Sequence, residues 1–318
     1  MAGEFGLSKD IEHLPENVLL EIFKYLPVKD LCTAGRVVSD NTLWRHVDLH
    51  QYKLNLHKMW KVIRCHFSNV LISLCLRGYM DPTIINWKKQ SLSDAMLKEL
   101  QTRCPNIKQL ELIQTNVTNI SCQGLPHKLR ILKITHSYIP QGWFEQMSQN
   151  PCKSTLLELD LSHSRMTSVI DINHLSCLST LSSLKVNGCY RVNERGIRII
   201  AEKFPQLTVL ELSATKCTDL ALHQISIHLT NLKRLNLSHC HTLTDAGLGD
   251  VGACLKQLEW LHLQDCRKIT DQGLLHLLGL VHLRYCYLTD INVTEMTLEK
   301  LKTSLKECDI IYRKSQTT

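Results

Sequence analysis

The sequence contains no long hydrophobic run. No stretch of its 318 residues approaches the roughly 20 apolar residues that a membrane-spanning helix needs. The segment at the start of the chain has no apolar core of the kind found in a secretory signal peptide. These two absences predict an intracellular protein that works in the cytosol, in the nucleus or in both.

Motifs of the common enzyme and cofactor-binding classes are also missing. The sequence has no G-x-S-x-G nucleophile elbow and no phosphate-binding Walker loop. Its 14 cysteines include no C-x-x-C pair, so they predict reduced, structural thiols rather than a metal or redox site. The net charge is +7, but the basic residues are scattered and do not alternate with aromatics, which argues against nucleic-acid binding. We therefore expect a non-catalytic protein without a metal or cofactor, and an enzyme is the weakest alternative.

A spaced pattern of leucines runs through most of the chain. The segments Leu181–Cys189, Leu232–Cys240 and Leu258–Cys266 follow the frame L-x-x-L-x-L-x-x-C, with valine at one position of the first, which is the signature of a leucine-rich repeat. Looser copies begin at Leu71, Ile107, Leu129, Leu156 and Leu207. Successive copies from Leu156 onward start 25 or 26 residues apart. The pattern predicts an α/β fold, a leucine-rich-repeat solenoid with the shape of a horseshoe.

Each repeat contains a strand and then a helix. In a strand, alternate side chains share a face, so Leu235 and Leu237 point to one side and Arg234 points to the other. Each predicted helix start has a capping residue followed by an acid. The capping side chain accepts a free backbone N–H, and the acid is stabilised by the positive end of the helix dipole. These starts are Ser93-Asp94, Asn193-Glu194, Thr218-Asp219, Thr244-Asp245 and Thr270-Asp271. We expect helix residues such as Leu220, Leu222 and Ile225 to pack against the strand leucines.

The segment before the repeats has a different character. Leu14–Leu26 predicts a short helix with proline in its first turn, and Pro27 ends it. This helix is apolar on nearly all sides, so it needs burial on more than one side. Either it binds a partner or it only caps the solenoid.

Three parts of this segment carry a resemblance. Leu14-Pro15 with the helix that follows, Leu26–Leu31 and Leu43–Leu49 resemble an F-box, and the chain as a whole resembles the F-box/leucine-rich-repeat family. The resemblance implies a substrate receptor of a Skp–cullin–F-box ubiquitin ligase, whose F-box binds the Skp adaptor and, through it, cullin. The repeats are then expected to hold a protein substrate for ubiquitination and proteasomal degradation. The implied adaptor-binding residues are Leu14, Pro15, Val18, Leu19, Ile22 and Leu26.

One part of the F-box pattern is missing. Val38 runs directly into Ser39, so the segment that normally contributes a core tryptophan and much of the third helix is absent. We expect weaker adaptor binding, and the alternative function is an interaction scaffold that does not join a ligase. The predicted divisions are an N-terminal tail (1–11), an F-box with a truncated third helix (12–50), a connecting helix (51–70), the repeats (71–290) and a C-terminal cap and tail (291–318). The last clear strand is expected near Leu280–Tyr285, followed by a closing helix at Thr294–Leu305 and a closing strand at Asp309–Arg313.

The concave strand face is the predicted substrate surface. By the alternation of strand side chains, it displays Glu158, Asp160, Lys185, Glu211, Arg234, Asn236, Trp260 and His262. Trp260 is the predicted energetic anchor, because exposed tryptophans on binding faces often are. Local packing of Trp260 against Arg234 or against the C-terminal end is the alternative. The segment Asp81–Gln90 is either a binding loop or a bulge.

Two further patterns resemble binding motifs. Gly247, Gly249 and Gly252 match G-x-G-x-x-G, but a dinucleotide fingerprint needs its first glycine directly after a strand, and Gly247 is too far from the strand before it. His239, Cys240 and His241 stand near Cys266 in the predicted stack, yet no second ligand pair has metal-like spacing. A structural role is favoured for both patterns.

Overall fold

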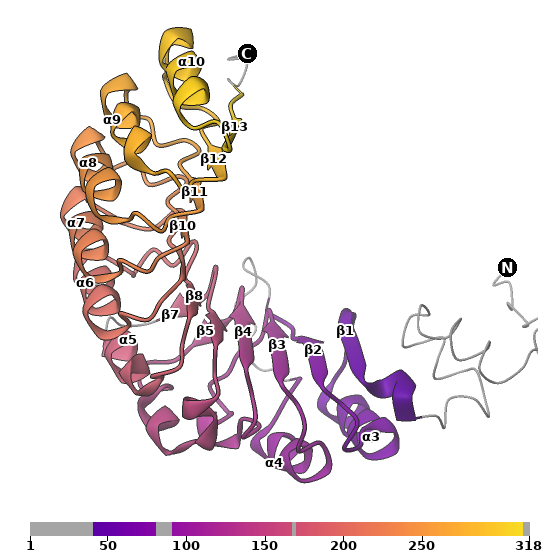
Figure 1. The fold of residues 1–318 in the computed structure, drawn as a ribbon. Helices are drawn as coiled ribbons and strands as arrows, with labels where there is room; N and C mark the ends of the chain where they lie inside the picture. Colours follow the sequence, from indigo (N-terminus) through magenta and orange to yellow (C-terminus); the bar gives the residue numbers. More distant parts are fainter. Residues whose placement is uncertain (1–40, 81–90, 167–169, 314–318) are drawn as a thin grey trace, which may run out of the picture.

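The computed structural model describes residues 41–80, 91–166 and 170–313. Within these ranges the chain winds into an arc, with strands along the inner side and helices along the outer side (Figure 1). The strands form one eleven-stranded parallel sheet, ordered β1-β2-β3-β4-β6-β8-β9-β10-β11-β12-β13, and β5 and β7 form a separate pair. The predicted leucine-rich-repeat solenoid is confirmed.

The strands are short, and most have only three residues in the second half of the chain. The large sheet contains β1 (His46–Lys53), β2 (Ser73–Arg77), β3 (Gln109–Ile113), β4 (Ile131–Thr135), β6 (Glu158–Asp160), β8 (Ser183–Lys185), β9 (Val209–Glu211), β10 (Arg234–Asn236), β11 (Trp260–His262), β12 (Tyr285–Tyr287) and β13 (Asp309–Ile311). The small pair is β5 (Tyr138–Ile139) with β7 (Arg165–Met166).

Helices follow the strands on the outer side. The α-helices are α3 (Leu56–His66), α4 (Asp94–Arg103), α5 (Ile170–His174), α6 (Glu194–Lys203), α7 (Asp219–His228), α8 (Asp245–Cys254), α9 (Asp271–Leu275) and α10 (Glu295–Ser304). The 3₁₀ helices are η2 (Asn41–Trp44), η3 (Cys122–Gly124), η4 (Glu145–Gln149), η5 (Pro151–Ser154), η6 (Leu175–Cys177) and η7 (His276–Gly279). No helix among these described segments is both long enough and apolar enough to cross a membrane.

The leucines of the repeat frame form the core. Leu235 pairs with Leu261 in the parallel ladder between β10 and β11, and both are fully buried. The same register aligns Leu210 with Leu235, so neighbouring repeats place equivalent leucines side by side. One repeat has no way to bury its apolar face alone, and stacking makes a continuous core.

The same turn follows eight strands of the large sheet, from β3 to β12. The turn residue lies two positions after the last apolar residue of the L-x-x-L-x-L frame, as His239 does after Leu237. It has a positive φ in eight repeats, at Gln114, His136, His163, Gly188, Ala214, His239, Asp265 and Asp290. The backbone N–H of each turn residue donates to a carbonyl of the following coil, as His239 does to Gln264 at 2.8 Å. This continuous set of hydrogen bonds compensates for the strained backbone conformation.

The turn cysteines link adjacent repeats. The Cys189, Cys240 and Cys266 thiols donate to the carbonyl oxygens of Leu161, Leu212 and Leu237 at 3.1, 3.4 and 3.1 Å. All three cysteines are buried, and each thiol gives a further hydrogen bond to a carbonyl oxygen that already accepts a backbone N–H of its own turn. This structural role agrees with the prediction for the turn cysteines.

The predicted helix starts are confirmed. Ser93, Asn193, Thr218, Thr244 and Thr270 are the N-cap residues of α4, α6, α7, α8 and α9, and each side chain accepts a backbone N–H of the first turn. Leu222 and Ile225 are buried as expected. Leu220 is not: it is 67% exposed, because it follows the first helical residue of α7 and points away from the sheet.

The sheet extends further at both ends than residues 71–290. At the first end, β1 pairs with β2 and aligns Val47 with Leu74. Buried Trp44 takes the position that Leu71 has in the next repeat, and its ring stacks on His66 at 4.4 Å. The closing helix and strand are present as α10 and β13.

One strand lies later than expected. The strand predicted near Leu280–Tyr285 is β12, which spans Tyr285–Tyr287. Cys286 pairs with Leu261 and is buried in the place of the second leucine of the frame. This substitution conceals the repeat, since the frame continues correctly from Leu283 but lacks its second leucine.

Candidate functional site

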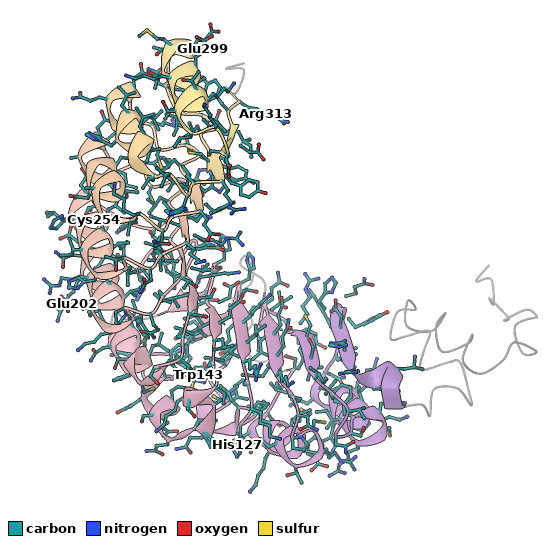
Figure 2. All side chains as sticks on the ribbon, in the orientation of Figure 1. His127, Trp143, Glu202, Cys254, Glu299 and Arg313 are labelled. Carbon is teal, nitrogen blue, oxygen red and sulfur yellow. The ribbon has the colours of Figure 1, made fainter. Side chains whose placement is uncertain are left out.

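The inner face of the sheet gathers polar and aromatic side chains from successive strands. Strand register aligns them in two rows, in which each position pairs with the next. The first row is Glu158, Ser183, Val209, Arg234, Trp260, Tyr285 and Asp309. The second row is Asp160, Lys185, Glu211, Asn236, His262, Tyr287 and Ile311. Arg313 is labelled on this inner side in Figure 2, whereas Glu202 and Cys254 are on the outer side.

Lys185 lies at the centre of a charged group on β6, β8 and β9. Its Nζ is 3.2 Å from Glu158 Oε1 and 3.7 Å from Glu211 Oε1. Burial alone lowers the pKa of Lys185, but the charges of Glu158 and Glu211 outweigh that effect and raise the pKa above its ordinary value. Lys185 therefore remains protonated at neutral pH and holds the two glutamates in place.

The carboxylates outnumber the cation in this part of the face. Asp160 also acts on Lys185 electrostatically, and its Oδ1 accepts the backbone N–H of Ser162 at 2.9 Å. Glu211 additionally accepts a hydrogen bond from the Asn187 amide at 2.7 Å. We call Glu158, Asp160 and Glu211 with Lys185 the acidic site.

Four rings gather on the neighbouring strands β11 and β12. The ring centroid of Trp260 lies 5.4 Å from that of His262 and 5.4 Å from that of Tyr287, and His262 and Tyr287 are 4.8 Å apart. Tyr285 pairs with Trp260 in the ladder and is exposed. We call Trp260, His262, Tyr285 and Tyr287 the aromatic platform.

Arg234 borders the platform from β10. Its guanidinium carbon lies 5.1 Å from the centroid of the Trp260 ring, a cation–π contact. Trp260 is therefore half-buried and packed locally, as the alternative for this residue predicts, but it still contributes surface to the inner face. Arg234 itself is exposed, and no carboxylate of the described residues lies within ion-pair distance of it.

Histidines lie at the edge of the platform. Burial lowers the pKa of His262 below its ordinary value, and the charge of His239 acts in the same direction, while a hydrogen bond with Gln264 opposes both. His239 Nδ1 is 3.1 Å from Asp265 Oδ2, and Arg267 Nε is 2.7 Å from Asp265 Oδ1. The lowered pKa favours the uncharged form of His262, so this part of the platform carries no charge at neutral pH.

All eight residues predicted for the substrate surface lie on this face. The structure adds Tyr285 and Tyr287, which the sequence interpretation missed because Cys286 concealed their strand. It also adds the pair Lys133 and Glu111, with 3.9 Å between Nζ and Oε2, further toward β1. Strand alternation alone would also place Ser162, Ser183 and Ser238 on the solvated face, but these three serines are buried. The predicted adaptor-binding residues and the segment Asp81–Gln90 lie outside the described residues.

The histidine–cysteine group has a structural explanation. Burial raises the pKa of the Cys266 thiol to about 12, so the thiol is protonated and donates to a carbonyl instead of acting as a ligand. His239 faces Asp265 rather than either cysteine. Among the residues that the structure describes, no three His, Cys, Asp or Glu side chains are arranged to hold a metal ion.

The glycines of the G-x-G-x-x-G pattern lie inside α8. A Cβ at Gly252 would overlap the carbonyl oxygen of His276, and one at Gly247 would lie 2.6 Å from Asp219 Oδ1. These two glycines therefore permit close packing between neighbouring coils. The position of the pattern within a helix agrees with the structural interpretation.

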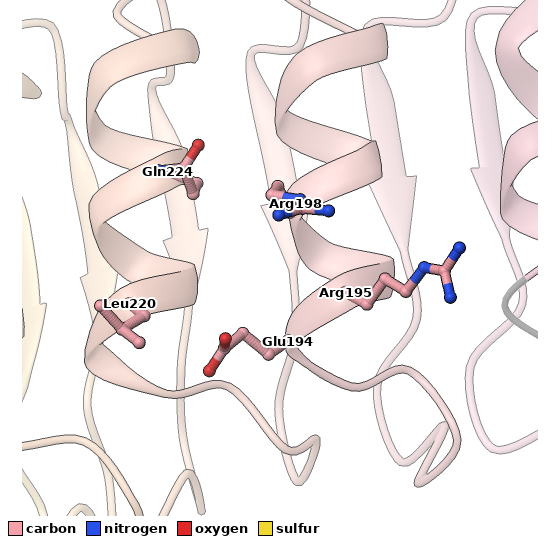
Figure 3. Close-up of a pocket in the computed structure, with 5 residues that line it drawn as sticks. All are labelled: Glu194, Arg195, Arg198, Leu220 and Gln224. Carbon is pink, nitrogen blue, oxygen red and sulfur yellow. The ribbon is translucent and has the colours of Figure 1, made fainter.

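An open pocket lies on the outer side between α6 and α7. Figure 3 shows its lining residues, which are Glu194, Arg195, Arg198, Leu220 and Gln224. Two of the lining side chains have partners of their own: Glu194 accepts the hydroxyl of Thr218 at 2.6 Å, and Arg198 lies 3.7 Å from Glu202. The inner face is the stronger candidate, since it combines aromatic surface with unbalanced charge.

Comparisons with known proteins agree with the repeat fold and the N-terminal resemblance. A family model described as F-box-like matches residues 11–50. F-box/LRR-repeat protein 12 of Bos taurus and of Homo sapiens are each 35% identical over 236 residues, which cover 71% of this chain and 71% of the relative. A chain from the crystal structure of the yeast Rad7 and Elc1 complex has a similar fold, with a TM-score of 0.54 and 16% identity over 93% of this chain and 81% of that chain. By its identity to these relatives, the chain belongs to the F-box/leucine-rich-repeat protein family.

Proposed function

We propose that this chain is the substrate-recognition subunit of a Skp–cullin–F-box ubiquitin ligase. The observation that supports this function most strongly is the order of two parts, an F-box-like segment at residues 11–50 followed by a leucine-rich-repeat solenoid. An F-box is an adaptor-binding module, and a solenoid offers a broad surface for a macromolecule. The two parts together suit a protein that links a substrate to an adaptor.

In this proposal the F-box-like segment and the inner face of the solenoid have different partners. The segment with Leu14, Pro15, Val18, Leu19, Ile22 and Leu26 binds the Skp adaptor, which connects to cullin. The inner face binds a protein substrate that is then ubiquitinated and degraded. The chain itself is non-catalytic and acts in the cytosol, the nucleus or both. The chemistry of ubiquitin transfer resides in other subunits.

The junction between the two parts supports this arrangement. Residues 46–50 belong both to the segment that matches the F-box-like model and to strand β1 of the solenoid. Trp44 and Val47 in this segment are buried in the common core. The last described residues of the F-box-like segment are therefore part of the first repeat of the solenoid.

The substrate surface is proposed on the basis of side-chain chemistry. It consists of the eight predicted residues Glu158, Asp160, Lys185, Glu211, Arg234, Asn236, Trp260 and His262, extended by Tyr285 and Tyr287. Half-exposed aromatic residues and arginine are the residue types that contribute most to binding energy at protein interfaces. Such a surface on a solenoid suits a protein partner better than a small molecule.

The experiment is co-migration of the purified chain with the purified Skp adaptor in size-exclusion chromatography. The proposal predicts a stable complex that a double substitution, Leu19→Asp with Ile22→Asp, abolishes. Trp260→Ala, far from the F-box-like segment in sequence, is the matched control and leaves the complex intact. Restoring a standard F-box segment of about seven residues after Val37 strengthens the complex.

The rival function is an interaction scaffold that does not join a ligase. The observation in its favour is the truncated third helix of the F-box pattern. If neither the native chain nor the repaired chain co-migrates with the adaptor, the scaffold replaces the ligase receptor.

A further inference from the structure

The inner face contains two chemically different parts in fixed register. The acidic site lies on β6, β8 and β9, and the aromatic platform lies on β11 and β12, with β10 between them. Within the described residues, helices cover the outer side of the sheet and the strands line the inner side (Figure 1). A partner that enters the arc therefore meets both parts at once.

The acidic site has a charge that one lysine leaves unbalanced. Its three carboxylates, Glu158, Asp160 and Glu211, surround the single ammonium of Lys185, which leaves a net charge of −2. The whole chain, by contrast, carries +7. A negative region inside a positive protein selects for a basic group, because unlike charges lower the energy of the complex and like charges raise it.

The platform selects for a different group. Its rings offer faces and edges to an aromatic or aliphatic side chain. Arg234 beside it carries a charge that no described carboxylate neutralises, and a guanidinium forms strong paired hydrogen bonds with a carboxylate. A partner segment with an apolar residue next to an acidic residue therefore complements the aromatic platform and Arg234.

The distance between the acidic site and the aromatic platform sets the number of residues between the two side chains of a bound segment that contact them. Lys185 on β8 and Trp260 on β11 are separated by three steps between adjacent strands, through Glu211 or Val209 and then Arg234 or Asn236. Strands lie about 4.8 Å apart, so the two parts are about 14 Å apart along the face. An extended chain advances about 3.3 Å per residue, and about four residues span that distance.

We infer that the inner face binds one extended segment of the substrate, in which a basic residue lies about four residues from an aromatic or aliphatic residue that has an acidic neighbour. This inference rests on the proposed function, because it names the substrate class of the proposed surface. The basic side chain lies among the carboxylates of the acidic site, and the apolar side chain lies on the aromatic platform. The opposite charges at the two ends give the segment a single direction.

The test is a selection of random twelve-residue peptides displayed on phage, carried out on the full chain. The expected pool is enriched in a basic residue about four positions from an aromatic or aliphatic residue with an acidic neighbour. Three variants are selected in parallel: the pair Glu158→Gln with Glu211→Gln, Trp260→Ala, and Glu202→Gln on the outer face as the matched control. Thermal unfolding followed by circular dichroism establishes that each variant is folded.

The variants separate the two parts of the face. The double glutamine variant keeps the apolar preference and loses the basic one, whereas Trp260→Ala does the reverse. Glu202→Gln gives the same pool as the native chain. For a synthetic peptide from the native pool, the double glutamine variant weakens binding by about tenfold in fluorescence anisotropy, and raised salt reduces this difference.

Several results overturn the inference. They are a pool without a paired basic and apolar residue, a pool with acidic residues opposite the acidic site, and no enrichment over the display background. Equal loss of both preferences in each variant also overturns it. The adaptor experiment is independent: a chain that binds the Skp adaptor but selects other peptides contradicts only this inference. A chain that selects the expected peptides without binding the adaptor contradicts only the ligase function.

Discussion

The carboxylate of Asp245, at the start of α8, accepts two hydrogen bonds from Thr270 at the start of the next helix. The backbone N–H of Thr270 lies 2.7 Å from Oδ1, and its hydroxyl lies 2.6 Å from Oδ2. Asp219 binds Thr244 in the same way, at 2.9 and 2.7 Å. The acid that suits the positive end of its own helix therefore also fixes the start of the next one.

Removal of this link is expected to destabilise the solenoid. Asp245→Ala leaves the N–H of Thr270 without its acceptor, and we expect a loss of about 1–2 kcal/mol in the free energy of unfolding. Urea titration measures it. Glu299→Ala, which removes an exposed carboxylate from α10 (labelled in Figure 2), is the control and is expected to change the free energy by less than about 0.5 kcal/mol. An equal effect of both substitutions would exclude a special role for the Asp245 link.

Two glycines of α8 are expected to respond with opposite signs. A Cβ at Gly252 overlaps the carbonyl oxygen of His276, whereas a Cβ at Gly249 has no heavy atom closer than 3.8 Å. Gly252→Ala should destabilise the protein by about 1–3 kcal/mol through overpacking. Gly249→Ala should stabilise it by up to about 1 kcal/mol, the gain in helix propensity. Thermal unfolding of the two variants tests this, and destabilisation by both would contradict the packing account.

Truncation to Ala should cost much more stability on the buried face of a strand than on its exposed face. Leu235 and Leu261 are fully buried equivalents in adjacent repeats. Truncation of either to Ala should cost about 2–5 kcal/mol, because a cavity adds to the lost transfer free energy. Arg234→Ala should cost at most about 1 kcal/mol, the size of an exposed cation–π contact. Similar midpoints in denaturant for all three variants would show that the faces are assigned wrongly.

His262 should make stability depend on pH. Burial lowers its pKa in the folded state, so the unfolded chain binds a proton more readily. Its contribution is fully present above the ordinary histidine value of about 6.5 and is lost as the pH falls through the lowered pKa. His262→Gln should flatten the pH dependence of the free energy of unfolding in that window. An unchanged pH dependence in the variant would mean that His262 titrates normally.

Much of the fold follows from spacing in the sequence. The leucine frame predicts the buried faces of β10 and β11, and the cap-and-acid pairs predict five helix starts, since both depend on local geometry. Features that depend on neighbouring coils were not predicted. The link from Asp245 to Thr270 is one, because it joins residues 25 positions apart.

The errors have particular causes. Trp44 in place of a leucine conceals the first repeat, and Cys286 conceals the strand that carries Tyr285 and Tyr287. Leu220 looks like a core residue by its type, but its position at the start of α7 exposes it. The eight surface residues follow from strand alternation alone, whereas their assignment to a substrate stays a proposal.

The affinity for the Skp adaptor, measured by isothermal titration calorimetry on the full chain, tests the central claim most directly. A ligase receptor predicts one-to-one binding that Leu19→Asp with Ile22→Asp removes and that Trp260→Ala leaves unchanged. Absence of heat of binding both for the native chain and for the chain with a restored F-box segment would contradict the account.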